Sequence, residues 1–378
     1  MKIIALYLPQ FHPIPENDAV WGEGFTEWTN VRKAVPLYEG HEQPVVPYNQ
    51  NYYNLLDINV MRWQAELAKE YGIYGFCIYH YWIQGRKLLE KPLEQLLKNK
   101  DVPLRYCISW ANHSWTDSWK GTNKTLIAQT YGGKEDWDAH FDYFLPFFKD
   151  ERYICDNGKP LLLIFNPEDI PRLNEMLDYW QERAKDAGLK GIAFAYQNYY
   201  FGMKKNRDDS RFTYGVEHQP AYAFYDYRNK LTMFIREKGY KFLSKLQKKL
   251  HFSINMDVTA LEFMDYQKLW DKVIERVPVD EKRIPGAFSG WDNTPRKGKN
   301  GLVVKDASPE IFEKYMKIQI RRAREVYHKD MLFIAAWNEW AEGSMLEPDE
   351  KNGYAYLEAV RSALKENHEF PEEQDECN

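Results

Sequence analysis

The sequence has few cysteines, no long apolar run and no large excess of charge of one sign. Its four cysteines share no metal-ligand spacing, so we expect free thiols in a reducing compartment. Lys and Arg number 51 and Asp and Glu number 56, a net charge of −5, which excludes a strong basic field. No apolar run approaches the roughly 18 residues of a membrane span. We therefore expect no nucleic-acid partner and no membrane insertion.

Signals for secretion and for metal binding are also weak. The apolar stretch at residues 3–8 is too short for a signal peptide, and no small-residue cleavage site follows it. We interpret this stretch as a first strand and expect a cytoplasmic protein. The nine histidines show no His-x-x-x-His spacing, so we expect no metal. Asp136-Trp137-Asp138 matches the Asp-x-Asp pattern of nucleotide-sugar transferases, but so short a match in a helical stretch is close to chance.

Aromatic residues are abundant. The chain has 13 Trp, 27 Tyr and 20 Phe, and hydrophobic residues of all kinds make up 44%, enough for a large core. The aromatic rings could fill that core, or they could line a cleft where they stack on the C–H faces of sugars. Composition alone favours the core.

Short apolar runs alternate with helical patterns along the chain. We expect eight strands, at residues 2–11, 73–82, 104–112, 160–166, 192–198, 213–219, 286–291 and 331–338. Helices are expected at residues 60–71, 88–98, 135–149, 171–187, 228–276, 309–326 and 353–365. This order predicts a single (β/α)8 barrel of the TIM type. The alternative, a doubly wound sheet, lacks its Gly-rich turn after the first strand. We expect one domain over residues 1–365 and a frayed acidic tail over residues 366–378.

Three long βα loops, residues 12–59, 113–134 and 292–308, carry Trp, Gly, Asn and charged residues. Barrel enzymes hold their sites on such loops and at the carboxyl ends of the strands. The candidate substrate-binding residues there are Gln10, His12, Trp28, His80, Tyr81, Trp82, Trp110, Asn112, Gln197, Glu217, Trp291, Asp292, Trp337 and Asn338. Amides, carboxylates, imidazoles and indoles with few cations favour a polyhydroxylated ligand over a phosphate.

The densest signal is Trp337-Asn338-Glu339-Trp340-Ala341-Glu342-Gly343, at the expected end of the last strand. In a turn, residues three apart share one face. Two carboxylates that close cannot both ionise cheaply, so one takes a raised pKa and the pair can supply a general acid and a general base. Glycoside cleavage needs such a pair. The alternative is a solvated or helix-capping acidic pair; the flanking aromatic and amide residues favour catalysis.

Two further clusters have functional and structural interpretations. In Gly290–Arg296, Asp292 could accept hydrogen bonds from sugar hydroxyls and pair with Arg296, or could simply form an Asx turn. In Trp21–Trp28, two carboxylates between two indoles could cover a sugar subsite, or the loop could be packed by its tryptophans. His80 and His113 are more often core or rim histidines than ligands.

These segments, together with Leu6–Pro13, resemble the WbsX-type proteins, glycosyltransferases or lipopolysaccharide-biosynthesis proteins of bacterial surface-polysaccharide clusters. The resemblance covers about residues 2–365. That group in turn is similar to glycoside hydrolase family 99, the endo-α-mannosidases and endo-α-mannanases. Those are (β/α)8 barrels with an Asn-Glu-Trp-x-Glu-Gly motif after the last strand, which Asn338–Gly343 matches; Glu347-Pro348 also fits the pattern. The resemblance implies a glycoside-hydrolase-like catalytic domain over residues 1–365.

The resemblance also implies a mechanism. In family 99, hydrolysis retains configuration without a carboxylate nucleophile. Carried over, Glu339 would deprotonate the sugar 2-hydroxyl, which attacks C1 to form a 1,2-anhydro sugar, and Glu342 would be general acid and then general base. No metal or organic cofactor is implied. Ala341 stands where the hydrolases have His. The 2-hydroxyl must lie trans to the leaving group, as in α-mannosides and α-rhamnosides.

Three hypotheses follow. The first is a retaining, endo-acting glycoside hydrolase or transglycosylase, whose partner is an α-mannoside- or α-rhamnoside-type oligosaccharide or polysaccharide of a bacterial surface. The second is a sugar-nucleotide glycosyltransferase of lipopolysaccharide, O-antigen or capsule biosynthesis, although the sequence shows no phosphate cradle. The third is a non-catalytic glycan-binding protein.

Overall fold

The computed structural model describes residues 1–116, 124–197, 207–228 and 261–371. The predicted strand end at Asn198 and most of the helix predicted over residues 228–276 lie outside these ranges. Within them, no helix is long and apolar enough to span a bilayer. The expected cytoplasmic location and the boundary at residue 365 stay predictions.

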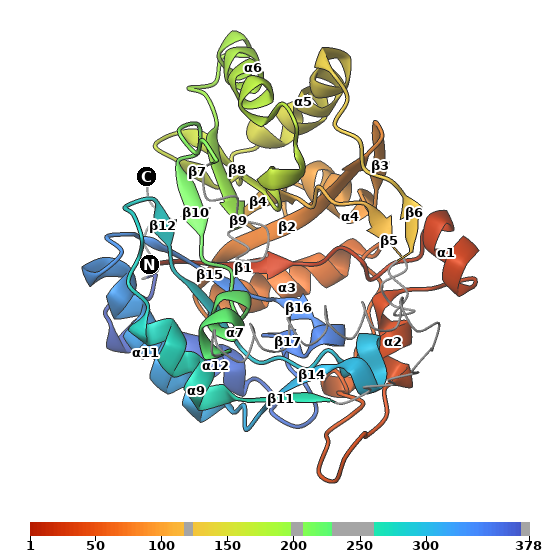
Figure 1. Ribbon diagram of the computed structural model, residues 1–378, viewed down its shortest axis with the longest axis vertical. Helices are drawn as coiled ribbons and strands as arrows, with labels where there is room; N and C mark the ends of the chain where they lie inside the picture. Colours follow the sequence, from red (N-terminus) through yellow and green to blue (C-terminus); the bar gives the residue numbers. More distant parts are fainter. Residues whose placement is uncertain (117–123, 198–206, 229–260, 372–378) are drawn as a thin grey trace, which may run out of the picture.

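A nearly closed parallel barrel forms the centre of the fold (Figure 1). Its strands, in spatial order, are β12 (Arg283–Ile284), β10 (Tyr214–Val216), β9 (Ala193–Gln197), β8 (Lys159–Ile164), β4 (Tyr106–Trp110), β2 (Ile73–Ile83), β1 (Lys2–Tyr7), β15 (Met331–Ala335) and β13 (Gly286–Phe288). Only Pro285 separates β12 from β13, so the two ends of this order are successive parts of one strand. The predicted (β/α)8 barrel is confirmed.

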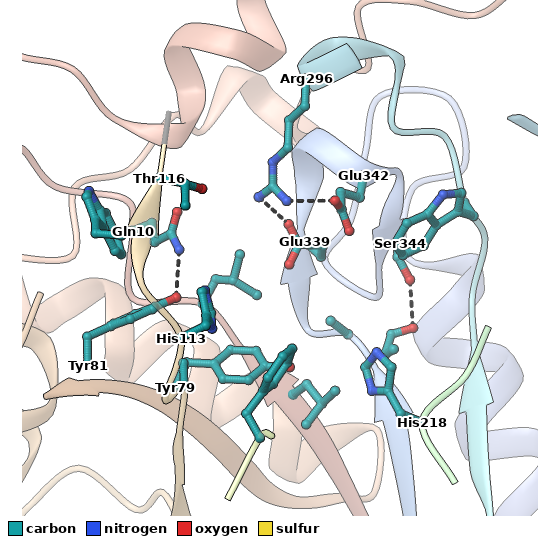
Figure 2. A pocket seen from close by; sticks show the side chains of 18 of the residues that line it. Gln10, Tyr79, Tyr81, His113, Thr116, His218, Arg296, Glu339, Glu342 and Ser344 are labelled. Carbon is teal, nitrogen blue, oxygen red and sulfur yellow. Dashed lines mark hydrogen bonds and ion pairs between the residues drawn. The ribbon is translucent and has the colours of Figure 1, made fainter. Parts of the chain in front are cut away.

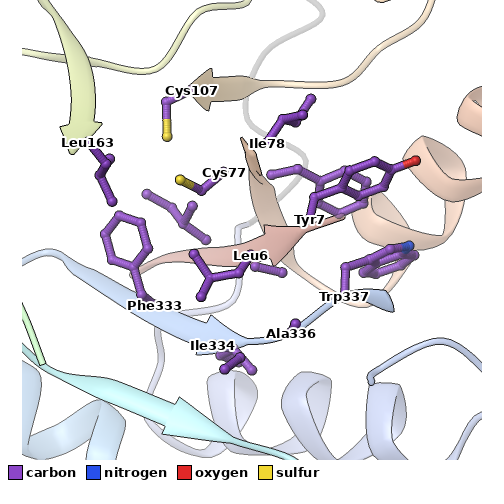
Figure 3. Close-up of a cluster of buried hydrophobic side chains, with 14 of the residues drawn as sticks. Leu6, Tyr7, Cys77, Ile78, Cys107, Leu163, Phe333, Ile334, Ala336 and Trp337 are labelled. Carbon is purple, nitrogen blue, oxygen red and sulfur yellow. The ribbon is translucent and has the colours of Figure 1, made fainter. Parts of the chain in front are cut away.

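The strands are buried on both faces, which is why they read as continuous apolar runs. In β1, residues 3–7 are all buried. Cys77 of β2 and Cys107 of β4 are buried and lie opposite each other in the register. Figure 3 shows the side chains of β1, β2, β4 and β15 converging in the core, to which Phe333 and Trp337 also belong. The barrel is therefore held by apolar packing between its strands and against its helices.

Helices cover the outside of the barrel. They are α3 (Ile58–Glu70), α4 (Lys91–Lys98), α5 (Lys134–Phe148), α6 (Leu173–Asp186), α7 (Ala221–Tyr227), α9 (Tyr266–Glu275), α11 (Pro309–Glu325) and α12 (Ala355–Glu366). In Figure 1, α5 and α6 lie at one end of the view, and α9, α11 and α12 lie together elsewhere on the surface. Apart from α7 and α9, each matches a predicted helix, with ends shifted by a few residues. α9 covers only the last part of the helix predicted over residues 228–276.

The loops are more structured than predicted. Residues 12–59 contain α1 (Pro15–Trp21) and α2 (Glu27–Lys33), and residues 113–134 contain the hairpin strands β5 (Trp115–Thr116) and β6 (Thr125–Ile127). The helix predicted through residues 262–265 is wrong. That segment is strand β11 (Glu262–Asp265), because it pairs in parallel with β14 (Leu302–Lys305), a contact that no local pattern encodes.

The start of the acidic tail is not frayed as predicted. Glu369 binds Arg324 of α11, with its Oε2 2.8 Å from the arginine Nη2. Residues 372–378 lie outside the described ranges.

Candidate active site

A cavity of about 260 Å³ opens at the carboxyl ends of the barrel strands. Its lining comes from β1, β2 and β15 and from the loops that follow the strands. The lining residues are Leu6, Leu8, Gln10, Trp21, Tyr79, Tyr81, Ala111, His113, Ser114, Trp115, Thr116, Phe165, His218, Trp291, Arg296, Ala335, Ala336, Glu339, Glu342 and Ser344. Figure 2 shows Glu339 and Glu342 beside Arg296 on one side of this cavity, with Gln10 and Tyr81 on the other.

The two glutamates share a face because the chain turns sharply after β15. Residues Trp340–Glu342 form one 3-10 turn, with Glu339 at its start, between the short antiparallel strands β16 (Asn338–Glu339) and β17 (Ser344–Met345). Gly343 ends the turn with φ +60°, and a Cβ there would lie 2.8 Å from the backbone nitrogen of Asp292. That close approach allows the Asp292 N–H to donate to the Glu342 carbonyl at 2.7 Å. Glycine is therefore required where the motif has it.

Arg296 joins the two glutamates. It lies on α10 (Thr294–Lys297), and its Nη2 is 2.6 Å from Glu339 Oε1 while its Nη1 is 2.8 Å from Glu342 Oε1. The predicted pairing of Arg296 with Asp292 is wrong. Asp292 accepts instead from His41 Nε2 at 2.8 Å and from the Thr294 N–H at 3.0 Å, so it forms the Asx turn that starts α10.

A third carboxylate completes the cluster. Glu27 is fully buried, and its Oε1 accepts from Arg296 Nη2 at 2.8 Å and from Arg296 Nε at 3.0 Å. Glu27 is the first residue of α2, where Thr26 caps the helix in a capping box with Thr29. The positive end of the helix dipole favours a carboxylate at this position. One guanidinium thus holds three carboxylates.

The environment changes the acidity of the cluster. Burial, followed by the negative charges of Glu342 and Glu27, raises the pKa of Glu339 well above its usual value, against the lowering effect of Arg296. Burial likewise raises the pKa of Glu27. Burial lowers the pKa of His113, and that of His218 to about 4. The two histidines on the cavity wall are therefore neutral near pH 7, and the cluster retains protons that exposed carboxylates would lose.

The opposite wall carries neutral hydrogen-bonding groups and rings. Gln10 Nε2 donates to the Tyr81 hydroxyl at 2.7 Å, and the buried Gln10 Oε1 has no hydrogen-bond partner among the described residues. The Tyr81 hydroxyl, which accepts from Gln10, keeps its own proton to donate, and both residues line the cavity. Gln197 does not reach the cavity but donates from Nε2 to the Tyr79 hydroxyl at 3.1 Å, so it supports a lining residue. Aromatic rings also line the cavity, as in a sugar-binding site; they belong to Trp21, Trp115, Phe165 and Trp291.

Only five predicted site residues line the cavity: Gln10, Tyr81, Trp291, Glu339 and Glu342. Several other predicted residues on the strands face the helix layer, because successive side chains of a strand point to opposite faces. On β2, Tyr79 and Tyr81 point inward, whereas His80 lies 3.0 Å from His140 of α5, and Trp82 stacks on the same ring at 4.5 Å. Trp110 also packs against α5 and α6, and Glu217 accepts from Tyr327 outside the barrel.

The remaining predicted residues support the site from behind. Asn112 fixes the backbone of Asn166, Asn338 fixes that of Leu8, and Trp28 donates to the Tyr53 carbonyl within an aromatic cluster. His12 contacts the Pro9 carbonyl at 2.9 Å, and Trp337 donates to Glu347 at 2.9 Å. None of these lines the cavity.

The sequence reasoning did not assign a central role to Arg296 or Glu27. Both belong to clusters that attracted attention, but nothing local shows that segments about 270 residues apart meet at one guanidinium. Tyr79 could have been found by applying strict strand alternation from Tyr81. Among the described residues no group of His, Cys, Asp and Glu suits a metal ion.

A cavity at the strand ends of a (β/α)8 barrel, with paired carboxylates and aromatic walls, is an arrangement found in carbohydrate-active enzymes. The chain matches the family Glycosyltransferase WbsX over residues 3–360, and it belongs to that family.

The curated relatives include "Uncharacterized protein WxcX" of Xanthomonas campestris pv. campestris, 35% identical over 365 residues. The match covers 96% of this chain and 49% of WxcX, so the chain spans about half the length of the curated relatives it matches.

Solved structures show the same fold. The GH99 endo-alpha-mannosidase from Bacteroides thetaiotaomicron matches with a TM-score of 0.53 and 13% identity, over 97% of each chain. A glycoside hydrolase-like protein matches with a TM-score of 0.55 and 12% identity, over 96% of this chain and 93% of its own. At such low identity the likeness concerns the fold.

Proposed function

We propose that the protein is a retaining, endo-acting glycoside hydrolase or transglycosylase acting on an α-mannoside- or α-rhamnoside-type bacterial surface glycan. The observation that carries the proposal is the pair Glu339 and Glu342, which project together into one cavity and are bridged by Arg296. The relation to the GH99 fold supports the same reaction class.

In the proposed first step, the Glu339 carboxylate takes the proton of the sugar 2-hydroxyl. The freed oxygen attacks C1, the bond to the leaving oxygen breaks, and the Glu342 carboxyl protonates that oxygen. In the second step, Glu342 deprotonates water or an acceptor hydroxyl that opens the 1,2-anhydro ring, and Glu339 returns its proton to O2. Two inversions at C1 give retention. A raised pKa makes Glu339 the stronger base once ionised.

The alternative of a nucleotide-sugar transferase fits the cavity less well. A diphosphate needs free cations or a nest of backbone N–H groups. Among the described lining residues Arg296 is the permanently charged cation, and three carboxylates already bind it. The walls instead offer amide, hydroxyl and aromatic groups, which suit a neutral sugar.

Product analysis by mass spectrometry tests the proposal. The enzyme is incubated in ¹⁸O-water with α-mannan and α-rhamnan oligosaccharides, with and without nucleotide sugars. We expect cleavage or transfer without any nucleotide, with ¹⁸O in hydrolysed products and retained anomeric configuration by NMR. Glu342→Gln should lower kcat/KM by about 10²–10⁴-fold. Glu350→Gln, an exposed glutamate a few residues away, is the matched control.

Other outcomes separate the alternatives. A substrate methylated at O2 should resist cleavage, and its cleavage would refute participation of the 2-hydroxyl. Products that form only with a nucleotide sugar would establish the transferase. Saturable glycan binding without turnover under any condition would indicate a non-catalytic glycan-binding protein.

A further inference from the structure

Glu347 is a buried carboxylate outside the catalytic pair, and it is 3% exposed. Its two oxygens accept four hydrogen bonds. The donors are Gln64 Nε2 at 2.6 Å and Trp337 Nε1 at 2.9 Å on Oε1, and Trp340 Nε1 at 2.7 Å and the Tyr53 hydroxyl at 2.8 Å on Oε2. All four donors are neutral, so the carboxylate is held by hydrogen bonds alone.

Two of these donors, Trp337 and Trp340, lie on either side of Glu339 in the sequence. Trp337 precedes β16, and Trp340 lies between Glu339 and Glu342. The backbone closes the same hairpin, because the Glu347 N–H donates to the Trp337 carbonyl at 3.1 Å. Each carboxylate oxygen of Glu347 therefore holds one indole, and the two indoles lie on either side of Glu339.

We propose that Glu347 is a positioning residue that holds the loop of Glu339 and Glu342 in its reactive geometry by accepting hydrogen bonds from both flanking indoles. The inference rests on the proposed function, since it assigns to Glu347 the placement of that acid and base. A carboxylate suits this role because it is the side chain that offers two acceptor oxygens and no donor. A carboxamide would turn an N–H₂ group toward one of the indole N–H groups.

The same contact makes the loop sensitive to pH. Burial raises the pKa of Glu347 to about 7, although its four donors lower it. The titratable groups that face it are the hydroxyls of Tyr7 on β1 and Tyr53, and the pKa of each is raised well above its usual range, mainly by burial. Among the described residues, the surface cavity that Glu347 adjoins adds further tyrosines but no Lys, Arg or His. Protonation converts one acceptor oxygen into a donor, so one hydrogen bond is lost as the pH falls below about 7.

Indole N–H resonances in ¹⁵N-labelled protein test the positioning role without any substrate. In the wild type, the Trp337 and Trp340 signals, assigned with Trp340→Phe, should move together with a midpoint near pH 7. In Glu347→Gln that titration should vanish. Two signals that do not titrate in the wild type, or that titrate unchanged in Glu347→Gln, would overturn the proposal whether or not the enzyme cleaves glycans.

Kinetics then separate positioning from simple stability. Glu347→Gln should lower kcat by about 10- to 100-fold with KM nearly unchanged, because a small misplacement of reacting groups costs that much. Tyr7→Phe is the matched control: it removes a hydroxyl that donates to Gln64 Oε1 at 2.8 Å but keeps all four donors of Glu347. It should keep both the indole titration and kcat. Equal losses in the two variants would show that Glu347 acts through stability alone. If the wild type cleaves no glycan, the proposed function fails while the indole titration still decides this inference.

Discussion

Replacing Arg296 by Met is the sharpest test of the three-carboxylate cluster, because Met keeps much of the side-chain stem and removes the charge. Arg296 is the shared partner of Glu27, Glu339 and Glu342, at 2.6–2.8 Å. Their side chains are 0%, 15% and 20% exposed, so water cannot replace the lost cation fully. The variant would leave three carboxylates facing one another.

The size of the effect follows from this burial. Removing one partner of a buried ion pair costs about 3–5 kcal/mol. Unfolding entropy is about 2.1 cal/mol/K per residue, so a chain of 378 residues changes by about 0.8 kcal/mol per degree. We therefore expect the Tm to fall by about 4–6 °C near pH 7.

The loss of stability in Arg296→Met should depend on pH, and it should grow as the pH rises. Without the guanidinium, the carboxyl groups of Glu27 and Glu339 take still higher pKa values in the folded protein than in the unfolded chain, where a Glu titrates at about 4.3. The folded state then binds more protons, so stability falls as pH rises. The deficit of the variant should be smallest near about pH 5 and largest near about pH 8.

Thermal unfolding followed by circular dichroism across this pH range measures the deficit. Arg183→Met is the matched control, because Arg183 of α6 also holds two carboxylates of α5, Asp138 and Asp142, but these are 38% and 62% exposed. Its loss should be at most about 1 kcal/mol and nearly independent of pH. A variant of Arg296 as stable as the wild type, or with a deficit that grows toward low pH, would refute the reasoning.

Three further predictions concern the same cavity. The proposed mechanism needs an ionised Glu339, so kcat/KM should fall with decreasing pH, with an apparent pKa above the usual value of a Glu. A pH profile with an acid limb near about 4.3 would contradict this. Tyr81→Phe should raise KM about tenfold with little change in Tm, because it removes one hydrogen-bonding hydroxyl from the wall that Tyr81 shares with Gln10. An unchanged KM in steady-state kinetics would count against that wall as a subsite. Gly343→Ala should lower the free energy of unfolding, measured in urea, more than Gly188→Ala does. Both glycines have a positive φ, but of the two only Gly343 has a backbone atom within 3 Å of the added Cβ. Equal losses would argue against the close approach.

The barrel could be predicted because its elements are encoded locally. β15 and residues 161–164 of β8 are uninterrupted apolar runs, as strands buried on both faces must be, and the helices between the strands show one apolar face. The pair Glu339 and Glu342 could also be predicted, since a spacing of three in a turn places both on one face. Segment 262–265 could not, because its conformation depends on pairing with residues 302–305.

Fewer of the predicted binding residues line the cavity, for a related reason. The sequence showed where β2 ends, but both faces of this strand carry aromatic and polar groups. Composition therefore did not distinguish Tyr81, which lines the cavity, from His80 and Trp82, which contact the helix layer. A buried polar residue looks the same in the sequence whether it binds a ligand or another side chain. Only the face of the strand on which the side chain lies separates the two cases.

Local patterns in the chain were therefore sufficient for the barrel and the acidic pair, because periodicity and spacing act within a few residues. The electrostatic character of the site came from contacts across the whole chain. Arg296 meets Glu27 and Glu339, and Glu347 meets Gln64, only once the barrel has closed. Burial and neighbouring charge determine a pKa, and both depend on where distant segments lie after folding.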